Sequence, residues 1–242
     1  MVSNYKLTIQ YDGTDYAGWQ IQDNARTVQG TMSDAIRIIT TEEVNLIGSG
    51  RTDSGVHALG QVANFRYEKE IDIYRFQHSL NSILPIDISV INIQKVSESF
   101  HARFDAKERT YLYLISKEKY PFYYKYSLLK KNLDVSLLNE LSNAFIGEND
   151  FTSFCRKNSD VKDKTCTLYF IRWRETKNFY LFFISADRFL HGMVRTIIGT
   201  LFKTLDLGES KKYIENIFNE KSREAAGEAV AAKGLFLYKV NY

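Results

Sequence analysis

The sequence is poor in proline and cysteine and has no long hydrophobic run. Its 242 residues include only two prolines and two cysteines, and no segment is dominated by glycine, serine or charges of one sign. The chain is therefore predicted to fold continuously, without a low-complexity linker. Cys155 and Cys166 are too few for a disulfide framework and lack the C-x-x-C spacing of metal and redox sites. We expect two buried thiols in a reducing compartment.

Apolar runs long enough to cross a membrane are missing from the sequence. Residues 1–13 contain no apolar core of signal-peptide length. These absences predict a cytoplasmic protein that has no membrane partner. The formal net charge of +3 is a mild basic excess, compatible with a nucleic-acid partner but not specific for one.

Hydrophobic residues make up 44% of the chain and include 16 phenylalanines and 16 tyrosines, which allows a sizeable core. Alternating apolar residues predict strands, and apolar residues spaced three and four apart predict helices. The predicted strands are 4–11, 44–47, 62–67, 88–96, 110–115, 168–173, 179–185 and 235–240. The predicted helices are one beginning at residue 28 and those at 73–84, 135–145, 188–205 and 213–218.

The elements group into two parts of similar content with a seam near residue 105. The predicted fold class is α+β, with two similar α/β halves whose antiparallel sheets are flanked by helices. The first half covers residues 1–104 and the second covers residues 105–242. A chain of this length accommodates two such halves around a shared cleft, where we expect the active site.

The densest cluster of reactive side chains lies in residues 50–58, Gly-Arg-Thr-Asp-Ser-Gly-Val-His-Ala. Asp53 can act as a nucleophile or general base, and Arg51 can pair with a phosphate or a base plane. Residue types alone favour an ordinary turn, in which Asp53 makes an Asx turn and the glycines take positive φ. A metal site formed by Asp53 and His57 is less well supported than a catalytic role for Asp53, because no third ligand has a convincing spacing.

A predicted strand carries Arg109, Tyr111 and Tyr113 on one face. A tyrosine on such a face can stack on a nucleobase or move a proton through its hydroxyl. On spacing alone, a core tyrosine whose hydroxyl bonds to the backbone is the simpler interpretation.

The predicted helix 188–205, which Asp187 can cap, has an apolar stripe bordered by Arg188, His191 and Arg195. An arginine at the edge of a core helix usually has a carboxylate partner, because an unpaired charge there is costly. The alternative is an arginine whose head reaches water. Two glycines beside the stripe, at 192 and 199, would let another chain come close.

Basic residues alternate with aromatic ones in two further segments, residues 100–104 and residues 120–126. Such a composition is typical of RNA-binding surfaces. Ordinary solvated loops share it, and they are the default interpretation.

Together these segments resemble the TruA family of transfer-RNA pseudouridine synthases, from residue 5 to about residue 237. The resemblance rests on motifs that occur in the family's order at fitting separations. They are YDGTDYAGWQ at 11–20, TVQG at 27–30, GRTD with GVHA at 50–58, FHAR at 100–103, and FLH with MVR at 189–195.

The resemblance implies an isomerase that converts uridine to pseudouridine in the anticodon stem-loop of transfer RNA. It also implies a homodimer that needs no metal and no organic cofactor. By resemblance, Asp53 is the catalytic aspartate, Tyr111 the active-site tyrosine, and Arg195 the cation paired with Asp53. Arg51 is implied to hold the target nucleotide outside its helix. The residues expected to contact substrate are Tyr111, Arg51, His57 and Arg188.

Two features depart from the family pattern. Ser54 stands where the family usually has alanine, a small change beside the catalytic residue. Residues 226–235 replace a proline-containing stretch, lack both prolines and add a negative charge. We expect the second change to alter the C-terminal wall of the cleft, and so substrate choice, rather than the reaction.

Two other functions are open at this point. One is a catalytically altered RNA-binding paralogue with the same fold, although binding alone would not need Asp53, Tyr111 and Arg195 together. The other is an enzyme such as a glycosidase with an aspartyl nucleophile. That chemistry typically requires a second carboxylate as acid or base, and none lies beside Asp53 in the sequence.

Overall fold

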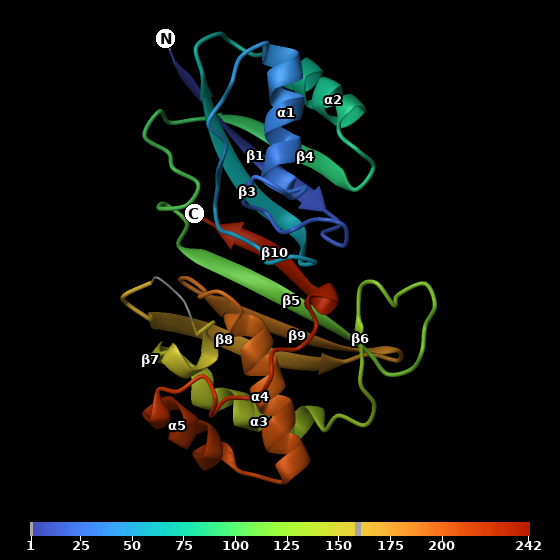
Figure 1. Cartoon of the computed structure of the whole chain (residues 1–242), viewed down its shortest axis with the longest axis vertical. Helices are drawn as coiled ribbons and strands as arrows, with labels where there is room; N and C mark the ends of the chain where they lie inside the picture. Colours follow the sequence, from blue (N-terminus) through green and yellow to red (C-terminus); the bar gives the residue numbers. More distant parts are fainter. Residues whose placement is uncertain (1, 158–160) are drawn as a thin grey trace. The chain divides into compact units, whose positions relative to one another are not determined.

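The computed structural model describes residues 2–157 and 161–242, which form two compact units (Figure 1). Unit 1 comprises Met1–Lys107 and Phe236–Tyr242, and unit 2 comprises Glu108–Leu235. The division predicted after residue 104 differs from this one mainly in the final strand. From Phe236 onward that strand is part of unit 1, where it pairs with His57 and Ala58.

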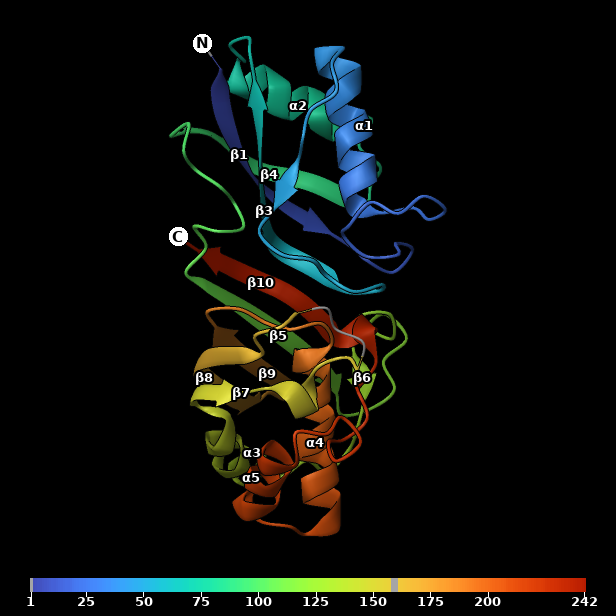
Figure 2. The same ribbon diagram turned by 60° about the vertical axis from the view of Figure 1, so that its left-hand side comes forward.

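Unit 1 is a sheet with two helices on one side (Figures 1 and 2). Its strand order is β4-β1-β3-β10, with β2 also beside β3. β1 is antiparallel to β3 and β4, whereas β10 joins β3 in parallel. The elements are β1 (Ser3–Tyr11), α1 (Val28–Thr40), β2 (Ile47–Gly48), β3 (His57–Tyr67), α2 (Ile73–Ile83), β4 (Ile88–Val96) and β10 (Leu235–Asn241).

Local sequence explains where the first elements of unit 1 form. In β1 every second side chain is buried, from Tyr5 through Leu7 and Ile9 to Tyr11, as expected for a strand with one face on the core. α1 begins after Thr27, whose hydroxyl accepts a hydrogen bond from the Gly30 N–H and so satisfies a free helix donor.

The strands of unit 2 are covered by three helices on one face (Figures 1 and 2). Its strand order is β5-β9-β8-β7, all antiparallel, with β6 beside β5 in parallel. The strands are β5 (Glu108–Ser116), β6 (Leu128–Leu129), β7 (Gly147–Asp150), β8 (Thr165–Glu175) and β9 (Phe179–Ala186). The helices are α3 (Val135–Ser142), α4 (Met193–Leu207) and α5 (Lys211–Glu220), with short 3-10 turns η1 (Asn143–Phe145), η2 (Thr152–Phe154) and η3 (Ala232–Gly234).

The predicted fold class is confirmed, but two strands of unit 1 have bounds different from those predicted. β2 is only two residues long, because residues 44–46 have no strand partner and the Leu46 carbonyl accepts from the Gln29 side chain at 2.8 Å. β3 begins at His57 instead of residue 62. Most of its residues are buried on both faces, which hides the alternation by which a half-buried strand is recognised.

The predicted helix 188–205 is wrong at its start. α4 begins at Met193, after Gly192 has taken a left-handed conformation with φ 74, which interrupts a helical path. Asp187 does not cap the helix, because its carboxylate accepts from the Thr167 and Arg188 N–H groups. Only Arg195 of the three predicted polar residues therefore lies in α4.

Both cysteines are free and buried, as the sequence predicts. Burial raises the pKa of the Cys166 thiol to about 11 and moves the pKa of the Cys155 thiol upward as well. Both groups therefore stay protonated near neutral pH, in the form that is a poor nucleophile. In the described residues, no helix combines the length and the apolar character that a membrane crossing requires.

Candidate active site

Asp53 lies in the loop between β2 and β3 of unit 1. Its side chain is half-buried, and its own carbonyl accepts a hydrogen bond from the Val56 N–H at 3.1 Å. Gly55 takes φ 74 within this turn, a conformation that favours glycine. The loop therefore has the tight, partly glycine-dependent form that its residue types predict.

The opening motif of the sequence holds this loop in place. The Trp19 N–H donates to the Thr52 carbonyl at 3.1 Å, and the Gly55 N–H donates to the Tyr16 carbonyl at 3.3 Å. The backbone is thus fixed on both sides of Asp53 by one segment, residues 12–19, which we call the clamp segment. The motif is visible in the sequence, but its role in holding the Asp53 loop is not.

Two glycines of the clamp segment let it approach the Asp53 loop closely. Gly18 has φ 98, and a Cβ there would lie 2.4 Å from the Thr52 carbonyl oxygen and 3.1 Å from the carbonyl carbon of Asp53. A Cβ on Gly13 would lie 2.0 Å from the Val56 carbonyl oxygen. Either side chain would force backbone to move, so the position of Asp53 depends on both glycines.

A set of buried polar contacts supports the loop where it leaves β2. The Tyr11 hydroxyl lies 2.8 Å from Oγ1 of Thr52. Gln61 donates through Nε2 to the Gly50 carbonyl at 3.0 Å and accepts from the Ser49 hydroxyl at 2.7 Å. Burial raises the pKa of Tyr11 well above its ordinary value, so its hydroxyl keeps its proton. The sequence gives no spacing signal that would have identified Gln61.

His57 is buried, with 1% of its surface exposed. Its Nδ1 accepts from the Gly13 N–H at 3.0 Å and lies 3.1 Å from Oδ1 of Asp12. Its ring stacks on Phe236, with centroids 4.7 Å apart. These contacts tie the clamp segment to β3 and β10, and they give His57 a supporting place in unit 1.

Arg51 lies on the exposed side of the same loop. Its Nε donates to Oε1 of Gln20 at 3.1 Å, so a residue just after the clamp segment orients the guanidinium. Arg51 remains exposed, and a cation in this position beside Asp53 suits a phosphate or a displaced base.

In unit 2, Tyr111 and Tyr113 of β5 have different environments. Tyr113 is fully buried, and its hydroxyl donates to the Ala231 carbonyl at 2.7 Å. It is the core tyrosine with a backbone partner that spacing alone favours. Tyr111 is half-buried, and its ring meets Phe189 edge to face at 5.1 Å and 89°. Of the two, Tyr111 is the one that a ligand could contact.

Arg195 lies in the first turn of α4 and binds the segment that departs from the family pattern. Its Nε donates to the Val230 carbonyl at 2.7 Å, and its own carbonyl accepts from the Val230 N–H at 3.2 Å. A Cβ on Gly199 would lie 1.7 Å from the Glu228 carbonyl oxygen. The close approach predicted beside this glycine is therefore made by the same chain, not by another one.

Arg188 precedes α4 and is engaged within unit 2. Its Nη2 donates to the carbonyls of Asp163 and Thr165, each at 2.7 Å, and lies 3.1 Å from the Asp163 carboxylate. Its Nε donates to Thr165 at 3.1 Å. The guanidinium thus holds the start of β8, and Arg188 directly precedes Phe189, the residue whose ring contacts Tyr111.

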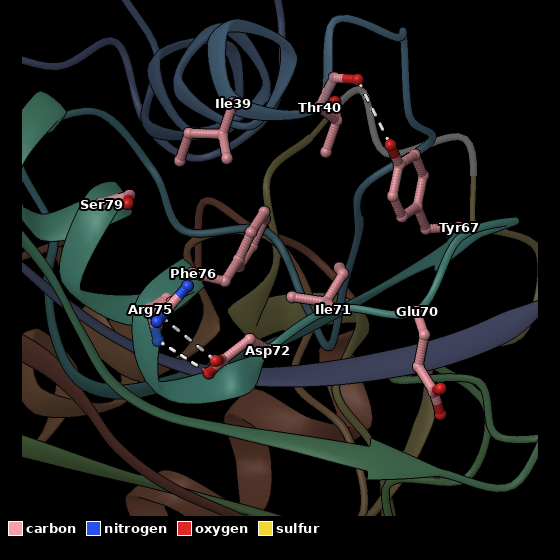
Figure 3. A pocket seen from close by; sticks show the side chains of 9 residues that line it. All are labelled: Ile39, Thr40, Tyr67, Glu70, Ile71, Asp72, Arg75, Phe76 and Ser79. Atoms are coloured by element: carbon pink, nitrogen blue, oxygen red, sulfur yellow. Dashed lines mark hydrogen bonds and ion pairs between the residues drawn. The ribbon is translucent and has the colours of Figure 1, made fainter.

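A surface hollow of about 240 Å³ in unit 1 lies elsewhere, between the ends of α1, α2 and β3 (Figure 3). None of the predicted site residues lines it. Four of its lining residues pair with one another, Tyr67 with the Thr40 carbonyl at 3.3 Å and Arg75 with Asp72 at 3.5 Å. In the part of the chain that the structure describes, no group of three or more His, Cys, Asp or Glu residues could hold a metal ion.

The comparisons with known proteins agree with one another. A family model described as tRNA pseudouridine synthase matches residues 7–105 and 141–242. The chain is 42% identical to "tRNA pseudouridine synthase A" of Caldicellulosiruptor saccharolyticus, over 99% of each chain. It is also 42% identical to "tRNA pseudouridine synthase A 2" of Clostridium perfringens, over 99% of each chain. The corresponding Bacteroides fragilis protein is 39% identical over 100% of this chain and 97% of its own.

Proposed function

The chain belongs to the tRNA pseudouridine synthase family, and we propose that it isomerises uridine to pseudouridine with Asp53 as its catalytic carboxylate. The full-length identity to enzymes of that name carries the assignment of the reaction and of transfer RNA as substrate. The clamp segment carries the proposal for Asp53, because it fixes the backbone on both sides of that one carboxylate. Preorganised reactive groups are what catalysis requires.

The reaction sets clear demands on the protein. The N1–C1′ bond breaks, the uracil turns, C5 bonds to C1′, C5 loses its proton and N1 gains one. A base within a stem is out of reach of a side chain, so it must first be flipped out. An ionised Asp53 then serves either by attacking C1′ or by removing the 2′ proton to give a glycal. We propose that Arg51 braces the space that the base leaves.

Tyr111 is proposed to stack on the flipped uracil and to accept the C5 proton, directly or through a water. Phe189 packs edge to face against its ring, and the preceding residue, Arg188, is bound to the start of β8. Tyr111→Phe should bind transfer RNA within about twofold of the wild type. It should form product at least about 100-fold more slowly, the usual size of a general-base contribution. Single-turnover rates at saturating enzyme measure the effect.

A matched control for that variant is Tyr113→Phe, on the same strand. It loses a core hydrogen bond to Ala231, so it should lower the melting temperature and leave the rate at saturation within about threefold. A normal rate for Tyr111→Phe would limit Tyr111 to a stacking role.

Arg195 is proposed to pair with Asp53 and keep it ionised and oriented, because an opposite charge favours the charged form of a carboxylate. Both Arg195→Lys and Arg195→Met lose the Nε bond to Val230, but only lysine keeps the charge. We expect the lysine variant to react at least about tenfold faster than the methionine variant, yet more slowly than arginine, whose planar fork fits a carboxylate. Equal single-turnover rates for the two would contradict the pairing.

The remaining proposals follow the resemblance and the local contacts. His57 and Arg188 are proposed to serve the substrate site through the backbone that they hold. We propose that the enzyme is a cytoplasmic homodimer, acts on the anticodon stem-loop and works without metal or organic cofactor.

Tritium release from transfer RNA labelled at uracil C5 tests the proposed function. The wild-type protein should release tritium in step with product, because C5 loses its proton only when it joins C1′. A catalytically altered paralogue would bind the RNA without release, and that outcome would overturn the proposed reaction.

A further inference from the structure

The segment between β5 and β6, residues 117–127, forms a closed loop that extends away from the sheet of unit 2 (Figure 1). We call it the aromatic loop. Its ends are joined where β6 pairs with β5, Ile115 opposite Leu128, and by a hydrogen bond from the Lys130 N–H to the Ser116 carbonyl at 3.1 Å. Compact surface loops with joined ends often carry function.

The aromatic loop has a defined internal structure. The Tyr123 N–H donates to the Tyr120 carbonyl at 3.1 Å, and the Tyr126 N–H donates to the Tyr123 carbonyl at 3.0 Å. The rings of Tyr120 and Tyr123 lie 5.7 Å and 5.1 Å from the ring of Phe179 in β9. These two tyrosines thus attach the loop to the sheet.

Two further rings of the loop, those of Phe122 and Tyr124, make no such ring contact with the described residues of unit 2. Phe122 is 90% exposed and Tyr124 is 60% exposed. The backbone that carries them is held, since Lys233 donates through Nζ to the Tyr124 carbonyl at 2.8 Å. A single exposed aromatic residue is ordinary, but two presented together on a fixed backbone form a platform for a flat ligand.

The surroundings of the aromatic loop are basic. Residues 117–131 contain five lysines and one glutamate. Lys117 pairs with Glu175 at 2.5 Å and Lys130 pairs with Asp206 at 3.0 Å. Lys119, Lys125 and Lys131 are exposed and make no ion pair with any residue that the structure describes. Positive charge therefore remains beside the two rings.

We propose that the aromatic loop is a second RNA-binding surface, where Phe122 and Tyr124 stack on unpaired bases and Lys119 and Lys125 contact phosphates. The inference rests on the proposed function, since it assigns the loop to the same RNA substrate. Exposed rings among basic side chains are the arrangement that binds single-stranded RNA. A protein partner fits less well, because lysine is depleted in protein interfaces.

The position of the loop predicts which step it affects. Tyr111 and Lys117 lie on one strand and its direct continuation, so about 20 Å separates them at 3.3 Å per residue. At that distance the loop does not touch the reacting base, but the same RNA can reach both. The loop should therefore govern RNA affinity and leave the chemical step unchanged.

The first test is the double variant Phe122→Ala/Tyr124→Ala. Its affinity for transfer RNA should fall at least about 30-fold, because each of the two rings loses a base stack that contributes about 5-fold or more. Its single-turnover rate at saturating enzyme should equal that of the wild type. Tyr74→Ala is the matched control, since Tyr74 is 81% exposed on α2 outside the loop. If both variants bind RNA equally well, the proposal is wrong.

The second test uses Phe122→Trp as a reporter. The native tryptophans, Trp19 and Trp173, are only 1% and 2% exposed, so the indole at position 122 dominates quenching by iodide. Addition of transfer RNA should lower its emission and shield it from iodide. An unchanged signal would overturn the proposal, as would dissociation of a dimer by the double alanine variant, which would make the loop a contact between copies. Wild-type turnover, measured in parallel, separates failure of this proposal from failure of the proposed reaction.

Discussion

Asp53→Asn is expected to remove turnover while the fold and most of the RNA affinity remain. Asparagine has almost the same shape as aspartate but lacks the charge that either chemical route requires. The loop should stay closed, because the bonds that hold it run through the backbone of Asp53, Thr52 and Gly55. Loss of a nucleophile or its activating group costs about 10⁴-fold to 10⁶-fold in comparable enzymes. Single-turnover rates with labelled transfer RNA measure the loss.

Ser54→Ala is the matched control, one residue further along. It removes the hydroxyl that donates to the Tyr16 carbonyl at 3.2 Å and restores the residue that the family usually has there. Its rate should stay within about threefold of the wild type, since one neutral hydrogen bond contributes only about 0.5–1.5 kcal/mol to stability and this hydroxyl takes no part in the reaction. If the activity of Asp53→Asn stayed within tenfold of the wild type, Asp53 would not be the catalytic carboxylate.

Gly18→Ala should have the next largest effect, although Gly18 itself has no reactive group. Its φ of 98 strains any other residue, at a cost of about 1–3 kcal/mol. The new Cβ would lie 2.4 Å from the Thr52 carbonyl oxygen, so the Asp53 loop must move. Small displacements of catalytic groups cost about 100-fold in rate. We expect at least that loss, measured as the single-turnover rate beside a thermal melt.

Gly50→Ala is the matched control for Gly18→Ala. It adds the same methyl group to the Asp53 loop, but apart from its two neighbours in the chain no residue comes within 4 Å of the new Cβ. Its rate and melting temperature should stay close to those of the wild type. If Gly18→Ala matched Gly50→Ala in rate, the clamp segment would not be what positions Asp53.

Much of the fold follows from local pattern. β1 and α1 were predictable because each has one buried face, with the spacing of its own geometry. The Asp53 loop was predictable as a candidate because a carboxylate, an arginine and two glycines occur close together. Its role as the active site is a proposal that rests on the resemblance, since turns of this composition are common.

Other features depend on contacts that periodicity does not record. The apolar stripe of α4 continues back through Leu190, so the pattern alone extends the helix past Gly192, where the left-handed backbone breaks it. The clamp on the Asp53 loop consists of backbone hydrogen bonds between distant segments. Histidine often binds ligands, which made His57 a candidate in the sequence. Its burial depends on Phe236, near the opposite end of the chain, whose ring stacks on it.

The altered residues 226–235 contact Arg195, which we propose pairs with Asp53. Val230 bonds to both the side chain and the backbone carbonyl of Arg195. A side chain on Gly199 would meet the Glu228 backbone, and one on Gly227 would meet the Gly199 backbone. The loss of the two family prolines therefore bears on the support of Arg195, in addition to its expected effect on substrate choice.

Nucleoside analysis of transfer RNA is the most direct test of the central claim, that this chain converts uridine to pseudouridine through Asp53. Unmodified transfer RNA is incubated with the wild-type protein or with Asp53→Asn, then digested and separated by chromatography. The wild type should produce pseudouridine in an amount equal to the uridine lost, without change of mass, and Asp53→Asn should produce none. Equal yields from the two proteins, or no pseudouridine from a wild-type protein that binds the RNA, would contradict the account.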